Sequence, residues 1–227
     1  MAIDILNVHS SAQGVDANSF DFSLTSLNNG GRWLCFDVYS QVTTGPGNIP
    51  TLSGAGLTYV AEANSQAVSA RTISRVYAWN PSTASYTLTM AFAGQTQLRC
   101  GLQVSQIEGA ELADPFVQTV TAGSSGGTSI TSGTLAAYAD GTNRFLGGHY
   151  HAVVEASTPS HTALAEITVE STVKLGTQWD ATAQPLSPTW DWASNASWGA
   201  ILSEVDAVAG GAATVVDPFG MSGFFGA

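Results

Sequence analysis

The sequence has very few basic residues: five arginines and one lysine, Lys174, stand against 17 acidic residues in a chain of 227. The net charge at neutral pH is therefore −11, although charged residues make up only 10% of the chain. Binding to nucleic acid and to anionic membranes both rely on clusters of Lys and Arg that neutralise phosphate groups. We therefore expect neither nucleic acid nor a membrane among the partners of this protein.

Long apolar runs are also missing. No stretch approaches the roughly 18 consecutive apolar residues that suggest a transmembrane helix. Residues 1–7 have neither the basic start nor the apolar centre of a secretory signal, and the first basic residue is Arg32. We expect a protein that is made in a cytoplasm and reaches the outside through cell lysis.

Cysteine is nearly absent, since Cys35 and Cys100 are the only two. Two cysteines do not make the disulfide framework of a small secreted domain. Alternation along the chain places Cys35 opposite the apolar face of Leu34 and Phe36, whereas Cys100 shares the apolar face of Leu102. We expect two free thiols, and a single disulfide remains the alternative.

Helical periodicity is missing throughout, whereas alternation with a period of two is frequent. It is clearest in residues 75–94, where Tyr86, Leu88 and Met90 occupy every second position after an Asn-Pro-Ser turn. This pattern is typical of half-buried antiparallel strands separated by turns. It predicts strands at residues 3–8, 19–24, 33–40, 57–62, 69–79, 85–92, 98–108, 116–121, 134–139, 143–154, 163–173 and 197–205.

Many short strands between turns predict an all-β fold, an antiparallel β-sandwich over residues 1–205. Residues 206–227 are rich in Gly and Ala, lack Lys and Arg, and contain Phe219, Phe224 and Phe225. A Gly-rich segment is costly to order without additional contacts for its large apolar groups. We expect an extended C-terminal arm whose phenylalanines form an interface with a neighbouring subunit; the alternative is that the arm packs on its own sandwich.

Two groups of residues have the spacing of catalytic or metal sites. His149 and His151 point to one side of a strand, as in a bidentate metal site, but no third ligand lies nearby in the sequence. We expect them to be outward-facing surface residues, with no metal and no cofactor. Glu166 and Glu170 share a strand face, and Glu204 and Asp206 could share one as well. Paired carboxylates are what a glycosidase requires, but solvated acids are expected on so acidic a chain.

Motifs for a nucleophile elbow or a phosphate loop are absent from the sequence, so we expect a protein without catalytic residues that is not an enzyme.

Trp179, Trp190 and Trp192 lie in a loop-rich region at residues 174–196. Exposed tryptophans of this kind stack on sugar rings or anchor protein interfaces. They are therefore candidate ligand-binding residues; the alternative is that their rings cap the end of the sandwich.

Five short motifs follow one another in an order that resembles a known module. They are GRWLCFDV at 31–38, GAGLTY at 54–59, YAWNPSTASYTLT at 77–89, LQVSQIEG at 102–109 and SWGAIL at 197–202. Over about residues 18–205 the chain resembles the jelly-roll-like β-sandwich module of phage virion proteins and of bacterial surface and secreted proteins. The resemblance implies a role in display, adhesion or capsid decoration, and it transfers no catalytic residues.

This resemblance and the missing export signal together lead to a hypothesis about function. The chain is expected to be a phage virion structural protein, a capsid decoration or head-fibre protein at the virion surface. Its partners would be other virion subunits of the capsid or tail, further copies of itself, and a host surface glycan. The alternative is a carbohydrate-binding module of a bacterial surface or secreted protein, and a tail-associated adhesin ranks third.

Overall fold

The computed structural model describes residues 2–14, 16–27, 31–45, 47–68, 70–80, 84–130 and 133–208. These residues form strands and no helix, and every strand pair is antiparallel. The predicted all-β class and antiparallel sandwich are confirmed. The described part of the chain contains no helix of the length and apolar character needed to cross a membrane.

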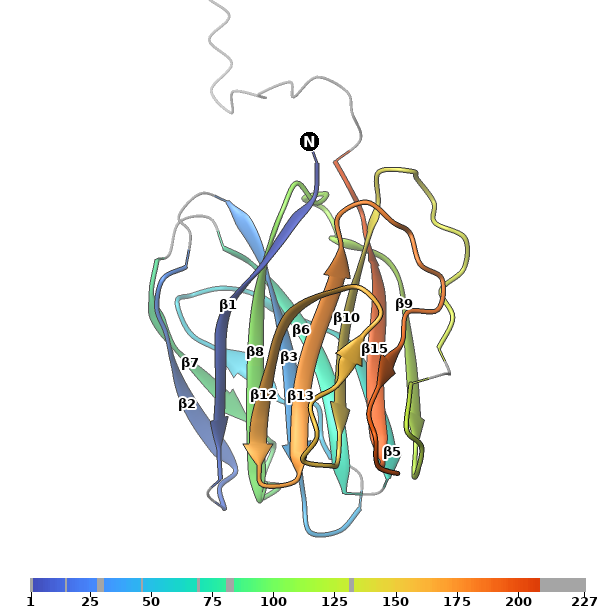
Figure 1. Ribbon diagram of the computed structural model, residues 1–227. Coiled ribbons are helices and arrows are strands. Elements are labelled where there is room, and N and C mark those ends of the chain that lie inside the picture. Colours follow the sequence, from blue (N-terminus) through green and yellow to red (C-terminus); the bar gives the residue numbers. More distant parts are fainter. Residues whose placement is uncertain are drawn as a thin grey trace, which may run out of the picture.

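Two five-stranded sheets form the body of the fold (Figure 1). The first sheet has the order β1 (Asp4–Gln13), β8 (Arg99–Glu108), β3 (Arg32–Gln41), β6 (Arg71–Asn80) and β5 (Tyr59–Val68). The second sheet has the order β12 (Thr162–Glu170), β13 (Val173–Asp180), β10 (Arg144–His151), β15 (Trp198–Val205) and β9 (Phe116–Ser124). Edge strands meet on both sides, since β5 contacts β9 and β1 contacts β12, so the two sheets enclose a common core.

The first sheet is covered on both faces. Leu34 and Phe36 of β3 pack against a small three-stranded sheet with the order β2 (Ser19–Leu24), β7 (Tyr86–Ala91) and β4 (Thr51–Ser53). Trp33 and Cys35 alternate with them and pack toward the second sheet. Because both faces are covered, β3 is buried along nearly its whole length, as are β6 and β8.

Loops cover the outer face of the second sheet. We call residues 125–130, 133–140, 152–161 and 181–196 the loop layer; it carries the short pair β11 (Thr158–Pro159) and β14 (Trp190–Asp191). Trp190 and Trp192 of this layer pack with Phe145 of β10 and Leu202 of β15 in a separate apolar cluster. The outer face of this sheet is therefore a third core.

A buried ion pair within the first sheet is also hydrogen-bonded to the second sheet. The Arg75 guanidinium on β6 donates two hydrogen bonds to Asp37 on β3, at 2.8 and 2.9 Å, and further bonds to Ser203 Oγ and the Leu146 carbonyl. Burial opposes its charge, but Asp37 outweighs burial and raises the pKa of Arg75 above its ordinary value. Gly148 leaves room for the carboxylate, since a Cβ there would lie 2.7 Å from an Asp37 oxygen.

Three predictions of individual strands are wrong. Residues 134–139 form no strand, because their backbone bonds to loop and side-chain groups, as Leu135 N does to Leu186 O. Residues 163–173 are not one strand: they contain nearly all of β12, a turn at residues 171–172 and the first residue of β13. The region 174–196, predicted to be rich in loops, begins with most of β13, in which Val173, Leu175 and Trp179 alternate with Lys174, Gly176 and Gln178.

The prediction of two free thiols is confirmed. Cys35 and Cys100 are both buried and unpaired, and they lie in different cores on opposite faces of the first sheet. Burial raises the pKa of both thiols far above the ordinary value. They therefore act as small apolar core residues.

Candidate functional site

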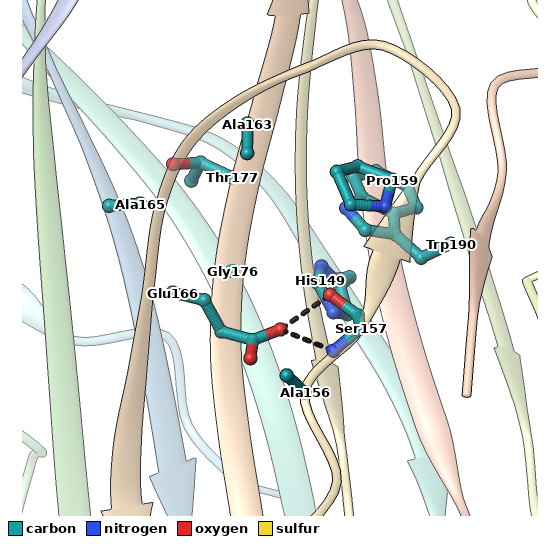
Figure 2. A pocket seen from close by; sticks show the side chains of 10 residues that line it. All are labelled: His149, Ala156, Ser157, Pro159, Ala163, Ala165, Glu166, Gly176, Thr177 and Trp190. Atoms are coloured by element: carbon teal, nitrogen blue, oxygen red, sulfur yellow. Dashed lines mark hydrogen bonds between the residues drawn. The ribbon is translucent and has the colours of Figure 1, made fainter. Parts of the chain in front are cut away.

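A pocket of about 210 Å³ lies on the outer face of the second sheet, between β12 and the loop layer (Figure 2). Its polar lining comes from His149 of β10, Glu166 of β12 and Ser157 of the loop layer. Trp190 forms an apolar wall, and much of the remaining lining is alanine or glycine. Small residues around a few polar groups leave room for a small ligand or an ion.

Strand register brings His149 and Glu166 together. Glu166 lies opposite Gly176 of the central strand β13, and Gly176 lies opposite His149, so the three positions form one row across the sheet. A Cβ at position 176 would lie 2.4 Å from the His149 ring. Glycine in the middle position thus allows the imidazole to occupy the space between the two outer strands.

The two histidines are neighbours on β10 and stack on one another. Their ring centroids are 5.3 Å apart with an interplanar angle of 3°, and both residues are fully buried. Trp192 stacks on His151 at 4.7 Å, and Trp190 lies against His149 at 4.6 Å. The tryptophans of the loop layer therefore cover the imidazoles and hold their orientation.

Hydrogen bonds define the protonation of the histidine pair. His151 Nε2 lies 2.8 Å from the carbonyl oxygen of Glu155, which can only accept, so Nε2 carries a proton. The lone pair of a neutral His151 is then on Nδ1, which faces His149 Nε2 at 3.1 Å. His149 donates across this contact, and its buried Nδ1 makes no hydrogen bond of ordinary geometry.

Both imidazoles are held in the neutral form. Burial lowers the pKa of His149 well below its ordinary value, and the adjacent His151 lowers it further. Burial likewise lowers the pKa of His151. Neutral imidazoles are the form that binds metal ions.

Glu166 is positioned by Ser157. The backbone N–H of Ser157 donates to Glu166 Oε2 at 3.0 Å, and the Ser157 hydroxyl donates to the same oxygen (Figure 2). The ligand atoms of Glu166, His149 and His151 all lie within 4.8 Å of one another. A half-buried carboxylate therefore converges with two buried imidazoles at one end of the pocket.

The structure corrects two expectations about the histidines. They share one side of a strand, as predicted, but they are not surface residues, because the loop layer covers the face to which they point. A third potential ligand also exists in Glu166, which is 15 residues from His151 and adjacent only in the sheet. The expectation of no metal rested on the missing ligand and loses that basis.

The tryptophans predicted to be exposed are mostly buried. Trp190 is 1% exposed and Trp192 is 6% exposed, so neither offers a free ring face for a sugar, and that interpretation is wrong for both. The capping alternative is closer, although the rings cover a sheet face instead of the end of the sandwich. Trp179 is half-buried and packs against the core between the two large sheets.

Glu166 and Glu204, which belong to different candidate pairs, are too widely separated to act together in glycoside hydrolysis. Strand pairing places Glu166 of β12 in the same row across the sheet as Ala200 of β15, three strand spacings away. Glu204 lies four residues further along β15. Strand geometry puts their backbones about 19 Å apart, whereas paired catalytic carboxyls lie about 5–9.5 Å apart. Glu204 instead accepts hydrogen bonds from Gln118, Asn143 and the Ala139 backbone.

The predicted interface residues Phe219, Phe224 and Phe225 lie outside the described residues. The residues that lead to this segment are described: the backbone N–H of Val208 donates to the Gly109 carbonyl at 3.0 Å, and that of Glu111 donates to the Asp206 carbonyl.

Comparisons with family models, curated proteins and solved structures find no match for this chain. The resemblance to the virion and surface module therefore rests on the short sequence motifs alone.

Proposed function

We propose that the protein is a structural component of a phage particle, a capsid decoration or head-fibre protein that acts by binding and not by catalysis. The five motifs of the resemblance fall on β3, the turn that leads into β5, β6 with β7, β8 and β15, in an all-β sandwich of the kind that it implies. The loop layer packs over the second large sheet and the small three-stranded sheet packs over the first, so a buried apolar core lies beneath each of these two surfaces. A display protein requires such a scaffold.

The observation that carries the proposal is the place where the C-terminal segment leaves the sandwich. Val208 and Asp206 are held by hydrogen bonds to Gly109 and Glu111, at the same end as the first described residues, since a Cβ on Gly109 would lie 2.4 Å from the Ala2 carbonyl oxygen. Figure 1 shows the N-terminus and the last described residues, after β15, at this end of the sandwich. Leu112, 62% exposed, adjoins this point. The segment with three phenylalanines thus follows residues that are held by backbone hydrogen bonds and lie close to the exposed Leu112 side chain.

Deleting residues 209–227 tests this role. We expect the melting temperature of the sandwich to remain nearly unchanged, because residues up to Ala207 form the four cores that the structure describes. We expect self-association, or binding to particle subunits, to be lost. Burying each phenylalanine in a partner contributes roughly 1.5–3 kcal/mol, so sedimentation velocity on both forms should separate them clearly.

A gentler variant serves as the control for the deletion. Replacing Phe219, Phe224 and Phe225 by serine keeps the length and removes the apolar groups, and it should also abolish association. Substituting exposed Val154, which is on a different loop and 63% exposed, should leave association intact. If the deletion unfolds the monomer and spares assembly, the segment belongs to its own core and the proposal is wrong.

The carbohydrate-binding alternative is weakened by the burial of Trp190 and Trp192, which removes the exposed stacking surface on which it rested. Binding of the intact protein to arrayed host glycans, retained after deletion of residues 209–227, would nevertheless favour that alternative over the particle role.

A further inference from the structure

We propose that His149, His151 and Glu166 bind a divalent transition-metal ion of the zinc class, with a remaining coordination position facing the pocket. This inference does not depend on the proposed function, because it rests only on the geometry of the second sheet and its loop layer. Two imidazoles and one carboxylate are a donor set that zinc and ferrous iron use when a coordination position stays open.

The two histidine nitrogens already have the separation that a shared ion requires. His149 Nε2 and His151 Nδ1 are 3.1 Å apart. Two nitrogens bound to one tetrahedral ion at about 2.0–2.1 Å would be about 3.3 Å apart. The separation of the two nitrogens is therefore already close to that of two ligands of one ion.

The orientation of His151 is that of a metal ligand. Its Nε2–H donates to the Glu155 carbonyl, which leaves the Nδ1 lone pair directed toward His149 and the pocket. Ligating histidines nearly always donate their second N–H to a carbonyl or carboxylate in this way. His149 becomes a ligand when the proton on Nε2 moves to Nδ1, so the ring stays neutral and its count of protons is unchanged.

Glu166 supplies the third ligand from a different strand. One of its carboxylate oxygens lies within 4.8 Å of a ring nitrogen of each histidine, and ligands of one tetrahedral ion would be about 3.3 Å apart. Ser157 donates two hydrogen bonds to Oε2, so the carboxylate is oriented by a partner outside the ligand set. Gly176 keeps the space between the ligands free, since any side chain there would collide with His149.

A titration of the full-length protein with Zn²⁺ and Co²⁺ after treatment with a chelator tests the site. We expect one ion per chain by calorimetry, and Co²⁺ should show the intense visible absorption of a low-coordinate nitrogen and oxygen site. His149→Gln and His151→Gln should each weaken binding by more than the 10–100-fold typical for loss of an outer partner. Ser157→Ala should weaken it by about 10-fold, as expected for an outer partner.

Two further variants show whether a loss of binding comes from the proposed ligands and not from misfolding. Glu166→Gln changes a half-buried edge residue without changing its size, so it should fold and still lose most of the affinity. His9→Gln alters a histidine on β1 whose ring packs against Phe22 of the small sheet and which is not among the proposed ligands, so this variant should bind as the wild type does. Circular dichroism of each variant confirms folding.

Three results would overturn the proposal. The first is no stoichiometric binding of Zn²⁺ or Co²⁺ by the wild type. The second is equal affinity in the wild type, Glu166→Gln and the histidine variants. The third is tighter binding of Ca²⁺ or Mn²⁺ than of Zn²⁺, which would indicate an oxygen-rich site elsewhere, because nitrogen donors favour the later transition metals.

Discussion

Asp37→Leu is expected to destabilise the protein by about 3–5 kcal/mol, because it leaves the fully buried Arg75 guanidinium without its counter-charge. For a domain of this size, that corresponds to a fall in melting temperature of about 6–20 °C. The remaining acceptors, Ser203 Oγ and the Leu146 carbonyl, are neutral and cannot replace the carboxylate. Urea denaturation followed by circular dichroism measures the loss directly.

The double variant Asp37→Leu with Arg75→Met distinguishes the unpaired charge from a simple packing defect. Removing both charges should recover much of the stability, since a buried pair is often replaceable by apolar residues of similar size. Glu108→Gln provides a matched control at the partly exposed pair with Arg32, where about 0–1 kcal/mol is expected. An effect of Asp37→Leu as small as that of the control would contradict the interpretation.

Trp190→Ala should cost about 3–5 kcal/mol, the range for truncating a large buried aromatic side chain. Trp190 is 1% exposed, lies against His149, and a Cβ on Gly147 would come within 2.6 Å of its ring. It is the main apolar connection between β14 and the sheet beneath. Its loss should therefore loosen the loop layer as well as lower the free energy of unfolding.

Trp179→Ala is the control for this prediction. Trp179 is also a tryptophan near the second sheet, but its side chain is half-buried, so truncation should cost clearly less. Limited proteolysis should cleave the Trp190→Ala protein within residues 152–161 or 181–196 faster than the wild type. Equal stability losses in the two variants, with unchanged cleavage, would show that the loop layer is held by other contacts.

The alternation of apolar residues was enough to predict the all-β class and most of the strands. Period-two patterns such as Tyr86, Leu88 and Met90 depend only on which side chains face a core, and this is a local property of the strand. The same reasoning correctly separated Cys35 from Cys100, because neighbouring positions on β3 face different cores. The scarcity of Lys and Arg is equally a property of composition and needed no structure.

The candidate site could not be predicted in this way. The sequence shows that His149 and His151 share a side of β10, but only the fold decides that this side is covered by Trp190 and Trp192. Glu166 becomes a potential third ligand through the register of β12, β13 and β10, which depends on pairing between residues far apart in the chain.

The strand β13 illustrates the same division between local pattern and tertiary contact. The local pattern of a strand is present, since Val173, Leu175 and Trp179 alternate with Lys174, Gly176 and Gln178. The strand predicted from the sequence nevertheless ended at residue 173, and residues 174–180 were placed in a loop-rich region. In the fold, the strand is bordered on both sides by β10 and β12, and Gly176 is needed where the His149 ring occupies the space above it. Local hydrophobic patterning thus determined the class of the fold, whereas long-range strand pairing decided which side chains meet, because register fixes neighbours that no local pattern contains.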